Sequence, residues 1–257
     1  MKKYIHIIAL AMGLVAGACS NIDENDRLVY VAPAEAQRNV LIEDFTGQRC
    51  VNCPNATEEI HKMQEVYGDN VIAVAIHCGP FGGITQTHSG LKTETGEEYW
   101  NHWFSSTQGQ PVAKINRGTS NGVYDSWAAD VANALKVTTD VSITGEAHEA
   151  DGTITISAKV GAKAGTTAKL QVWMTEDDIV DLQFMPNGKP SANYVHNHIF
   201  RAAVNGTWGE DIEFGESPAS KEWTIAIHED WKAANMNAVI FVYDDKEVRQ
   251  VVSVKVK

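Results

Sequence analysis

The sequence predicts an α/β domain followed by an all-β domain. Segments typical of strands alternate with segments typical of helices over residues 38–137. From Thr138 onward, apolar residues recur at every second position, which is the period of a half-buried strand. A length of 257 residues also suits two domains better than one. We therefore place the two predicted domains at residues 38–137 and 138–257.

The first residues have the organisation of an export signal. Lys2 and Lys3 precede an apolar stretch over residues 4–15, and three small residues then lead directly into Cys19. This arrangement resembles a bacterial lipoprotein cleavage box. The resemblance implies a signal peptide over residues 1–18 and a lipid attached to Cys19.

Other interpretations of this leader remain open. Ala16 stands where lipoprotein boxes more often have leucine. An ordinary secretory signal cut near Ala18 is one alternative. An uncleaved membrane anchor is another, although the apolar stretch is short for a spanning helix.

Residues 19–37 are predicted to form a tether. They are polar and then rich in alanine and proline, without a sustained period. Asp23, Glu24 and Asp26 fit a solvated linker. They also resemble the export signal that sends some lipoproteins to the outer face of the cell, and both interpretations stay open.

The predicted α/β domain contains three strands and three helices around a central mixed sheet. Residues 71–77 form a continuous apolar run, which is typical of a buried parallel strand. A glycine-rich loop over residues 79–90 follows this run. The predicted strands are 40–45, 71–77 and 112–116, and the predicted helices are 56–67, 94–104 and 124–135.

The predicted all-β domain has the strand and turn signals of an antiparallel sandwich. Residues 150–152 and 244–246 are predicted hairpin turns, because each combines turn-forming residues with strand-like runs on both sides. The predicted strands are 141–144, 153–156, 170–174, 223–227, 238–242 and 248–256. This spacing favours an immunoglobulin-like architecture.

The charge balance excludes several classes of partner. The formal net charge is −12, and removal of a leader that carries Lys2 and Lys3 would make it more negative. Such a chain is not expected to bind nucleic acid, and it offers no basic patch for anionic lipid headgroups. Any attachment to a membrane is therefore expected to come from the lipid on Cys19.

Cys50 and Cys53 are the most informative pair in the sequence. They lie three positions apart where a predicted strand passes into a predicted helix. A thiolate near the amino end of a helix is stabilised by the helix dipole, and the second thiol is close enough to resolve a mixed disulfide. Arg49 would lower the pKa of the Cys50 thiol further. In an exported protein the pair is expected to be oxidised.

Two segments carry a resemblance to the thioredoxin superfamily. Residues 44–53 place an Asp-Phe pair ahead of the cysteines, and residues 109–116 resemble the segment that carries a cis-proline in that superfamily. The resemblance implies a thioredoxin-like fold for residues 38–137. It also implies roles for four residues: Cys50 as the nucleophile, Cys53 as the resolving thiol, Asp44 as a proton shuttle and Pro111 as the shaper of the substrate groove. The sequence departs from the thioredoxin pattern at Arg49 and at Val51-Asn52.

A narrower resemblance covers the whole mature chain. The string Glu43-Asp44-Phe45-Thr46-Gly47 with Cys50-Val51-Asn52-Cys53-Pro54, and the later segment 194–201, resemble the outer membrane protein 28-related lipoproteins. That family joins a thioredoxin-like domain to a C-terminal β domain. The resemblance implies an outer-membrane lipoprotein. It is informative about the location and fold of the protein, and less so about its activity.

Redox chemistry is one of three interpretations of the Cys50–Cys53 pair. The pair is also compatible with an inert structural disulfide or with half of a zinc site. His77, Cys78 and His88 follow the apolar run and could complete such a site, but no second closely spaced pair exists, so no metal is predicted. Cys78 is either a buried small hydrophobe or a third redox thiol.

A pair of histidines and a set of aromatic residues are predicted to have mainly structural roles. His196 and His198 have the spacing of side chains on one face of a strand, and structural hydrogen bonding is favoured over metal binding. Trp100, Trp103 and Phe104 could line a peptide groove, but at helical spacing they are more often core.

We predict a lipid-anchored outer-membrane protein whose Cys50–Cys53 site exchanges disulfides with thiols of exported proteins or peptides. The alternative is a non-catalytic surface lipoprotein, an adhesin or a binder of an envelope partner through its β domain, with a structural disulfide. Neither function requires a cofactor. The sequence leaves open whether the protein faces the periplasm or the cell surface.

Overall fold

The computed structural model describes residues 38–85, 90–105, 107–118 and 120–257. The predicted signal peptide, the tether and Cys19 lie outside these residues. All described residues belong to one compact unit, which contains both predicted domains. The predicted boundary between residues 137 and 138 stays a prediction.

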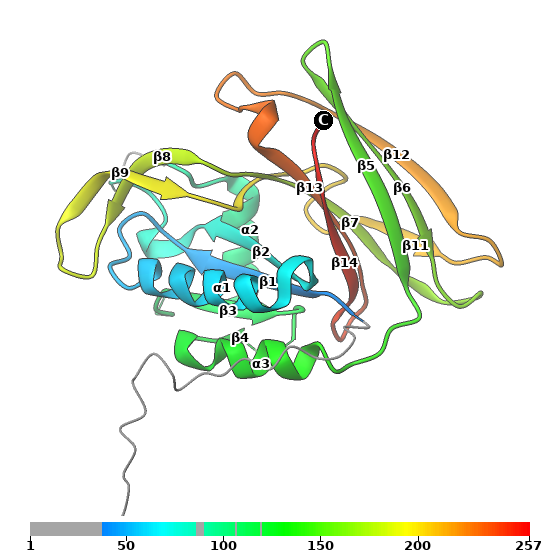
Figure 1. Ribbon diagram of the computed structural model, residues 1–257, viewed down its shortest axis with the longest axis horizontal. Coiled ribbons are helices and arrows are strands. Elements are labelled where there is room, and N and C mark those ends of the chain that lie inside the picture. The colour runs from blue at the N-terminus through cyan, green and yellow to red at the C-terminus, as the bar shows by residue number, and fades with distance from the viewer. Residues whose placement is uncertain (1–37, 86–89, 106, 119) are drawn as a thin grey trace, which may run out of the picture. The chain divides into compact units, whose positions relative to one another are not determined.

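A large mixed sheet organises the described part of the chain (Figure 1). Its strand order is β14-β13-β7-β10-β2-β1-β3-β4, and β11 pairs with β7 off this path. These strands are β1 (Val40–Thr46), β2 (Val71–His77), β3 (Val112–Ile115), β4 (Ser120–Asn121), β7 (Thr167–Glu176), β10 (Ile199–Ala203), β11 (Glu210–Glu213), β13 (Met236–Tyr243) and β14 (Val248–Lys255).

The predicted fold class, an α/β thioredoxin-like domain followed by an immunoglobulin-like sandwich, is wrong. Strands from both halves of the chain belong to the same sheet, because β10 lies between β7 and β2. Ile199 in β10 pairs with Glu176 in β7 and with Ala75 in β2. The described structure is mainly β, with three short α-helices. Residue periodicity shows which side of a strand is buried, but not which strand lies next to it.

A second sheet contains β5 (Ser142–Ala150), β6 (Thr153–Gly161) and β12 (Ala219–Ala226) in the order β12-β6-β5. Its buried residues share one hydrophobic cluster with residues of β7 and β13. The turn predicted between β5 and β6 is confirmed. Asp151 and Gly152 occupy it with φ of 51° and 76°, a left-handed geometry that glycine adopts freely.

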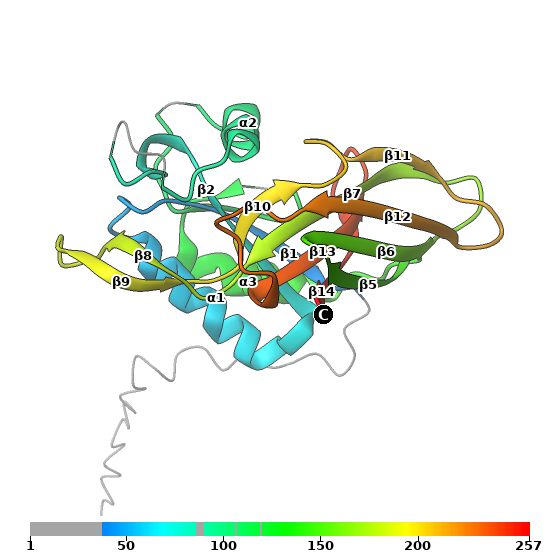
Figure 2. The same ribbon diagram turned by 90° about the horizontal axis from the view of Figure 1, so that it is seen from above.

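A two-stranded hairpin, β8 (Ile179–Phe184) with β9 (Pro190–His196), was not predicted. It extends from the mixed sheet at the end opposite the β5-β6-β12 sheet (Figures 1 and 2). Val180 lies directly opposite Val195 in this hairpin. Both of these valines are exposed, whereas Gln183 and His196 are buried.

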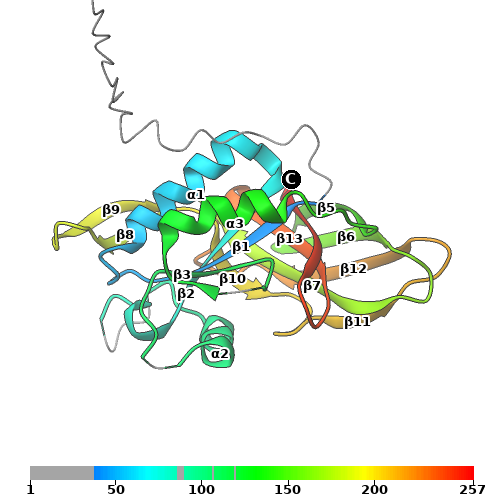
Figure 3. The same cartoon turned by 90° about the horizontal axis from the view of Figure 1, so that it is seen from below.

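The three predicted helices are confirmed with shifted ends as α1 (Cys53–Tyr67), α2 (Glu94–Trp103) and α3 (Trp127–Ala134). Helix α1 buries Ala56, Ile60 and Met63 along one face, as their spacing requires. Helices α1 and α3 cover one face of the mixed sheet and α2 covers the other (Figures 2 and 3). Single 3₁₀ turns are found at Gly68–Asn70, Gly79–Phe81, Tyr124–Ser126 and Ala233–Asn235.

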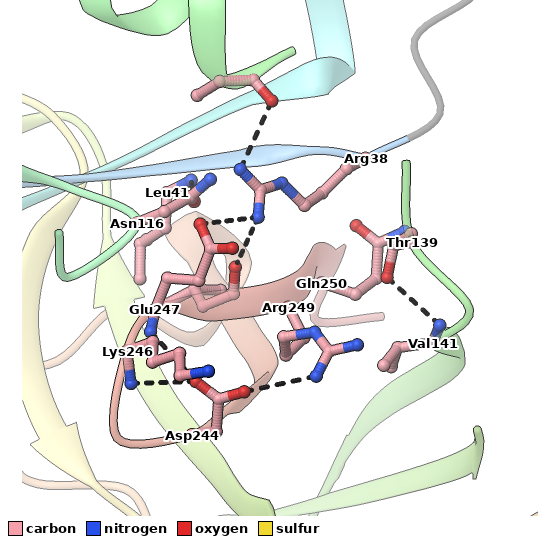
Figure 4. Close-up of polar contacts among 12 residues, drawn as sticks. Arg38, Leu41, Asn116, Thr139, Val141, Asp244, Lys246, Glu247, Arg249 and Gln250 are labelled. Carbon is pink, nitrogen blue, oxygen red and sulfur yellow. Dashed lines mark hydrogen bonds and ion pairs between the residues drawn. The ribbon is translucent and has the colours of Figure 1, made fainter. Parts of the chain in front are cut away.

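Arg38 links the start of the described chain to the turn that precedes the last strand, β14 (Figure 4). Its buried guanidinium forms an ion pair with Glu247 at 2.8 Å. It also donates hydrogen bonds to the carbonyl oxygens of Val248 and Ala134, each at 3.3 Å. The start of β1, the end of α3 and the turn before β14 are therefore held at one point.

Candidate functional site

Cys50 and Cys53 form a disulfide at the carboxyl end of β1. Cys53 is the first residue of α1, and Cys50 belongs to the turn that precedes it. Only 3% of Cys50 and 2% of Cys53 is exposed. The two predicted redox residues are therefore brought together, but the resulting disulfide is buried.

The turn before α1 packs tightly against residues 79–83. The amide of Cys50 donates to the Gly47 carbonyl oxygen at 3.0 Å, and the Arg49 amide donates to the Phe81 carbonyl oxygen at 3.0 Å. A Cβ on Gly47 would lie 2.2 Å from that same Phe81 oxygen, so only glycine fits there. The close approach of two backbone segments explains the glycine in this turn.

The Arg49 guanidinium is hydrogen-bonded to backbone carbonyl groups, and its predicted effect on the Cys50 thiol stays a prediction. Its guanidinium donates to the carbonyl oxygen of Gly83 at 3.1 Å and to that of Pro80. These bonds tie the guanidinium to the loop that follows β2. The side chain therefore contributes to the structure of the turn.

The β8–β9 hairpin covers the disulfide turn. The buried Gln183 side chain donates from Nε2 to the carbonyl oxygens of Cys50 at 3.0 Å and Gly47 at 3.2 Å. The Phe184 amide donates to the Gln48 carbonyl oxygen at 2.8 Å. In return, Gln48 Nε2 donates to the Asp181 carboxylate at 3.0 Å. The hairpin and the disulfide turn are thus joined through both backbone and side-chain groups.

Asp44 is a buried carboxyl group in the middle of the sheet. It lies in β1 between Ala75 of β2 and Ala113 of β3. Its Oδ1 has no hydrogen-bond partner within the described residues. Burial raises the pKa of Asp44 to about 7. The predicted role as a proton shuttle stays a prediction.

Pro111 follows a cis peptide bond and immediately precedes β3. Gln110 next to it donates from Nε2 to the carbonyl oxygens of Thr46 at 2.7 Å and Cys78 at 3.0 Å. Gln110 also accepts a hydrogen bond from the Phe81 amide. Gln110 therefore connects the end of β1 with the loop after β2. The predicted substrate groove at Pro111 stays a prediction.

Cys78 is a buried thiol in the core. Its Sγ donates to the Ile76 carbonyl oxygen at 3.2 Å. Burial raises the pKa of Cys78 well above its ordinary value, and Glu97 and Asp44 raise it further. The thiol is therefore protonated at neutral pH and poorly suited to nucleophilic attack.

Two buried histidines lie beside the disulfide turn. The rings of His77 and His196 meet edge to face with centroids 5.3 Å apart. Burial lowers the pKa of His77 to about 3 and that of His196 to about 4, so both rings are neutral at physiological pH. His198, by contrast, pairs with Asp177. The three histidines do not converge on one point.

The described residues contain no group of three His, Cys, Asp or Glu side chains arranged to hold a metal ion. His88, which the zinc interpretation invoked, lies outside the described residues. The aromatic residues of α2 belong to the core, because Trp100 is buried and Trp103 packs against Phe45 with ring centroids 5.6 Å apart.

Gln48 and Gln183 are the site residues that sequence reasoning missed. Both are fully or almost fully buried and join the disulfide turn to the hairpin. Glutamine is usually a surface residue, and the resemblance that covers residues 44–53 assigns no role to Gln48. Gln183 lies in no recognisable motif. No signal in one sequence marks them, because their partners are distant in the chain.

Comparison with known proteins supports a family assignment. The sequence model of the family described as "Outer membrane protein Omp28" matches residues 97–257, which is more than half of the chain. No curated protein matches the chain. No helix within the described residues is long and apolar enough to cross a membrane.

Two solved structures resemble this fold. HBP35 of Porphyromonas gingivalis superimposes with a TM-score of 0.65 at 13% identity, covering 87% of this chain and 77% of that chain. A protein from Agrobacterium tumefaciens superimposes with a TM-score of 0.56 at 16% identity, covering 86% of this chain and 95% of that one. At these identities the likeness concerns the fold alone. The family match is the finding that identifies the protein: the chain belongs to the Omp28 family of outer membrane proteins.

Proposed function

We propose that this protein is a non-catalytic outer membrane protein that binds another envelope or surface protein, and that its Cys50–Cys53 disulfide is structural. The burial of both cysteines beneath the β8–β9 hairpin carries this proposal. Exchange begins when a thiolate attacks a disulfide sulfur, so a covered disulfide reacts slowly.

The disulfide supports the hairpin in this proposal. It fixes the turn whose carbonyl groups, on Gly47 and Cys50, accept the hydrogen bonds of Gln183. Gln183 belongs to β8, so a rigid turn gives the hairpin a rigid base. The hairpin itself then extends beyond the mixed sheet (Figure 1).

The outward face of the hairpin is the proposed binding surface. Val180 and Val195 are cross-strand partners, and 59% of Val180 and 47% of Val195 is exposed. Exposed apolar side chains that lie together favour contact with another protein. An apolar surface on an envelope protein is the complementary partner.

The first test concerns exchange chemistry. The full-length oxidised protein and its dithiothreitol-reduced form are assayed for reduction of insulin disulfides, with thioredoxin as the positive control. We expect no turnover above the background rate of the reductant. Catalytic turnover that is abolished by Cys50→Ser would contradict the structural assignment.

The second test concerns the binding surface. A photo-reactive amino acid replaces the exposed Asn193 in β9, and intact cells are irradiated. We expect a discrete crosslink to an envelope protein that Val180→Lys abolishes. Val123→Lys is the matched control, because Val123 is 61% exposed outside the hairpin, and it should leave the crosslink unchanged. No crosslink, or a crosslink that survives Val180→Lys, rejects this surface.

Thiol–disulfide exchange with exported proteins is the second candidate function. The buried Asp44, with a pKa raised to about 7 by burial, favours it because such a carboxyl can gain and lose a proton near neutral pH. Exchange would require the hairpin to move away from Cys50. Insulin reduction that Gln183→Met accelerates and Cys50→Ser abolishes would support this candidate over the structural one.

We also propose that Cys19 carries the lipid anchor. The support is the leader sequence, because these residues lie outside the described range. Mass spectrometry of the mature amino terminus tests it directly. A diacylglyceryl-modified Cys19 is expected, and an unmodified end at Ser20 or Ala18 would overturn the assignment.

A further inference from the structure

A polar pocket of about 560 Å³ lies between the start of β2 and strands β13 and β14. It arises where β2 lacks a neighbour on one side. Strand β2 pairs with β10 through Ala75 alone, so no described strand pairs with residues 71–73 on that side. Asn39, just before β1, lines one side of the pocket. Its Nδ2 donates to the Val251 carbonyl oxygen of β14 at 2.9 Å.

Asp177 and His198 form a preorganised pair in the lining of this pocket. The Asp177 carboxylate accepts hydrogen bonds from the His198 amide at 2.7 Å and from Asn237 Nδ2 at 2.8 Å. His198 Nδ1 lies 3.1 Å from the same carboxylate. Burial alone would raise the pKa of Asp177, but the bonds and charge of His198 outweigh it and lower that pKa to about 2.

His198 is held in an uncommon backbone conformation. Its φ is 58°, in the left-handed region that residues other than glycine seldom adopt. The contact of Nδ1 with Asp177 leaves Nε2 as the ring atom that is free to bind a ligand, since no hydrogen bond joins it to another described residue. Its side chain is 30% exposed, so a ligand can reach it.

The rest of the lining is polar, and Asp69 is the one further charged side chain in it. The carboxamides of Asn39, Gln64 and Asn237 and the hydroxyls of Thr175 and Ser253 provide both donors and acceptors. Aliphatic residues of β2, β13 and β14 also border the pocket, and Val252 of β14 is the half-buried one among them. No lysine or arginine lines the pocket, which disfavours an anionic ligand.

We propose that this pocket binds a neutral saccharide. Each sugar hydroxyl both donates and accepts, which matches the carboxamides, the hydroxyls and the free His198 Nε2, and the C–H faces of the ring match the aliphatic residues. The volume lies within the range of about 300–1,000 Å³ that is usual for small-ligand pockets. This inference goes beyond the proposed function, because it depends on neither the hairpin nor the disulfide.

The experiment titrates the full mature protein with glucose, galactose, mannose, N-acetylglucosamine and maltose by calorimetry and saturation-transfer NMR. Putrescine and inorganic phosphate are the cationic and anionic probes. We expect at least one saccharide to bind, and neither charged probe to compete with it. Binding of putrescine or phosphate without binding of any saccharide overturns the proposal.

Two variants locate the binding. Ser253→Leu fills the pocket from the exposed edge strand β14, and His198→Asn removes the imidazole while keeping a residue that tolerates positive φ. Each should weaken saccharide binding at least about tenfold, as loss of hydrogen bonds predicts. Ser142→Leu, on the edge strand β5, is the matched control and should bind normally. Saccharide binding that survives Ser253→Leu, with circular dichroism showing that variant to be folded, rejects this pocket.

Discussion

Gln183 in β8 donates a hydrogen bond from its Nε2 to the carbonyl oxygen of Cys50 at 3.0 Å, across 133 residues of sequence. The same nitrogen donates to the Gly47 carbonyl oxygen at 3.2 Å. One buried carboxamide therefore links the disulfide turn to a hairpin that the second half of the chain supplies. This link holds the hairpin against the turn of a Cys-x-x-Cys pair that is buried at the start of a helix.

Gln183→Met should loosen the hairpin and expose the disulfide. Methionine keeps the length of the side chain but leaves the buried carbonyl oxygens of Cys50 and Gly47 without that donor, which costs about 1–3 kcal/mol. Urea unfolding should show this loss, and dithiothreitol should reduce the disulfide faster. Gln108→Met is the matched control, because among the described residues Gln108 Nε2 donates to the exposed Gly109 carbonyl oxygen alone. Equal reduction rates in both variants would refute the covering role.

Cys50→Ala combined with Cys53→Ala should lower the free energy of unfolding by about 2 kcal/mol. A disulfide that closes so short a loop removes only a limited amount of entropy from the unfolded chain. Denaturant titration of the oxidised protein and of the double variant measures the difference. In dithiothreitol the reduced natural protein should unfold near the midpoint of the double variant. A double variant as stable as the oxidised protein would show that the disulfide contributes nothing to stability.

Asp44 should make the protein less stable as the pH rises from about 4 to about 7. Burial raises the pKa of Asp44 from 3.8 to about 7, so the folded state holds a proton that the unfolded state releases within this window. Below the window the group contributes no pH dependence, and above it the full cost, up to about 4 kcal/mol, is present.

Asp44→Asn should remove this dependence. Urea unfolding at pH 5 and pH 8 compares the variant with the natural protein, and the variant should be the more stable of the two at pH 8. Parallel changes in both proteins between these pH values would show that Asp44 is not the titrating group.

Arg117→Met should destabilise the protein by about 3–5 kcal/mol, because it leaves the buried Glu43 carboxylate without its ion pair. Arg117 Nε lies 3.1 Å from Glu43, and its guanidinium lies 4.0 Å from the ring centroid of Tyr243. Burial raises the pKa of Glu43, and Arg117 opposes that rise.

A double-mutant cycle with Glu43→Gln separates the two contributions of Arg117. Glu43→Gln in the Arg117→Met background should recover part of the lost stability, since it removes the unpaired charge. Calorimetric and denaturant measurements of all four proteins provide the coupling energy. If the stability changes of the two substitutions are strictly additive, Arg117 and Glu43 are not energetically coupled. The contribution of Arg117 to stability would then come from its contacts with aromatic rings alone.

Much of the local structure could be predicted from the sequence. The continuous apolar run of β2 and the amphipathic pattern of α1 can be read from the sequence, because burial of their own side chains determines these patterns. The segment 109–116 resembles the one that carries a cis-proline in the thioredoxin superfamily, and the Gln110–Pro111 peptide bond is cis. The disulfide between Cys50 and Cys53 was expected as well.

Long-range arrangement could not be predicted in the same way. Strand β9 alternates residues that are mostly exposed or half-buried, so it lacks the apolar signal of a core strand. Strand β10 has five residues, and only its position between β7 and β2 merges the two halves into one sheet. The structural role of Gln183 depends on its hydrogen bonds to Gly47 and Cys50, which lie in another part of the chain. These features depend on pairing choices that one sequence does not encode locally.

The reduction potential of the Cys50–Cys53 disulfide tests the structural assignment most directly. The full mature protein is equilibrated in glutathione and dithiothreitol buffers of defined potential, and the trapped thiols are counted by mass spectrometry after alkylation. A structural disulfide predicts a potential below about −300 mV. A potential between about −180 and −230 mV, the range of disulfide isomerases and glutaredoxins, would contradict it.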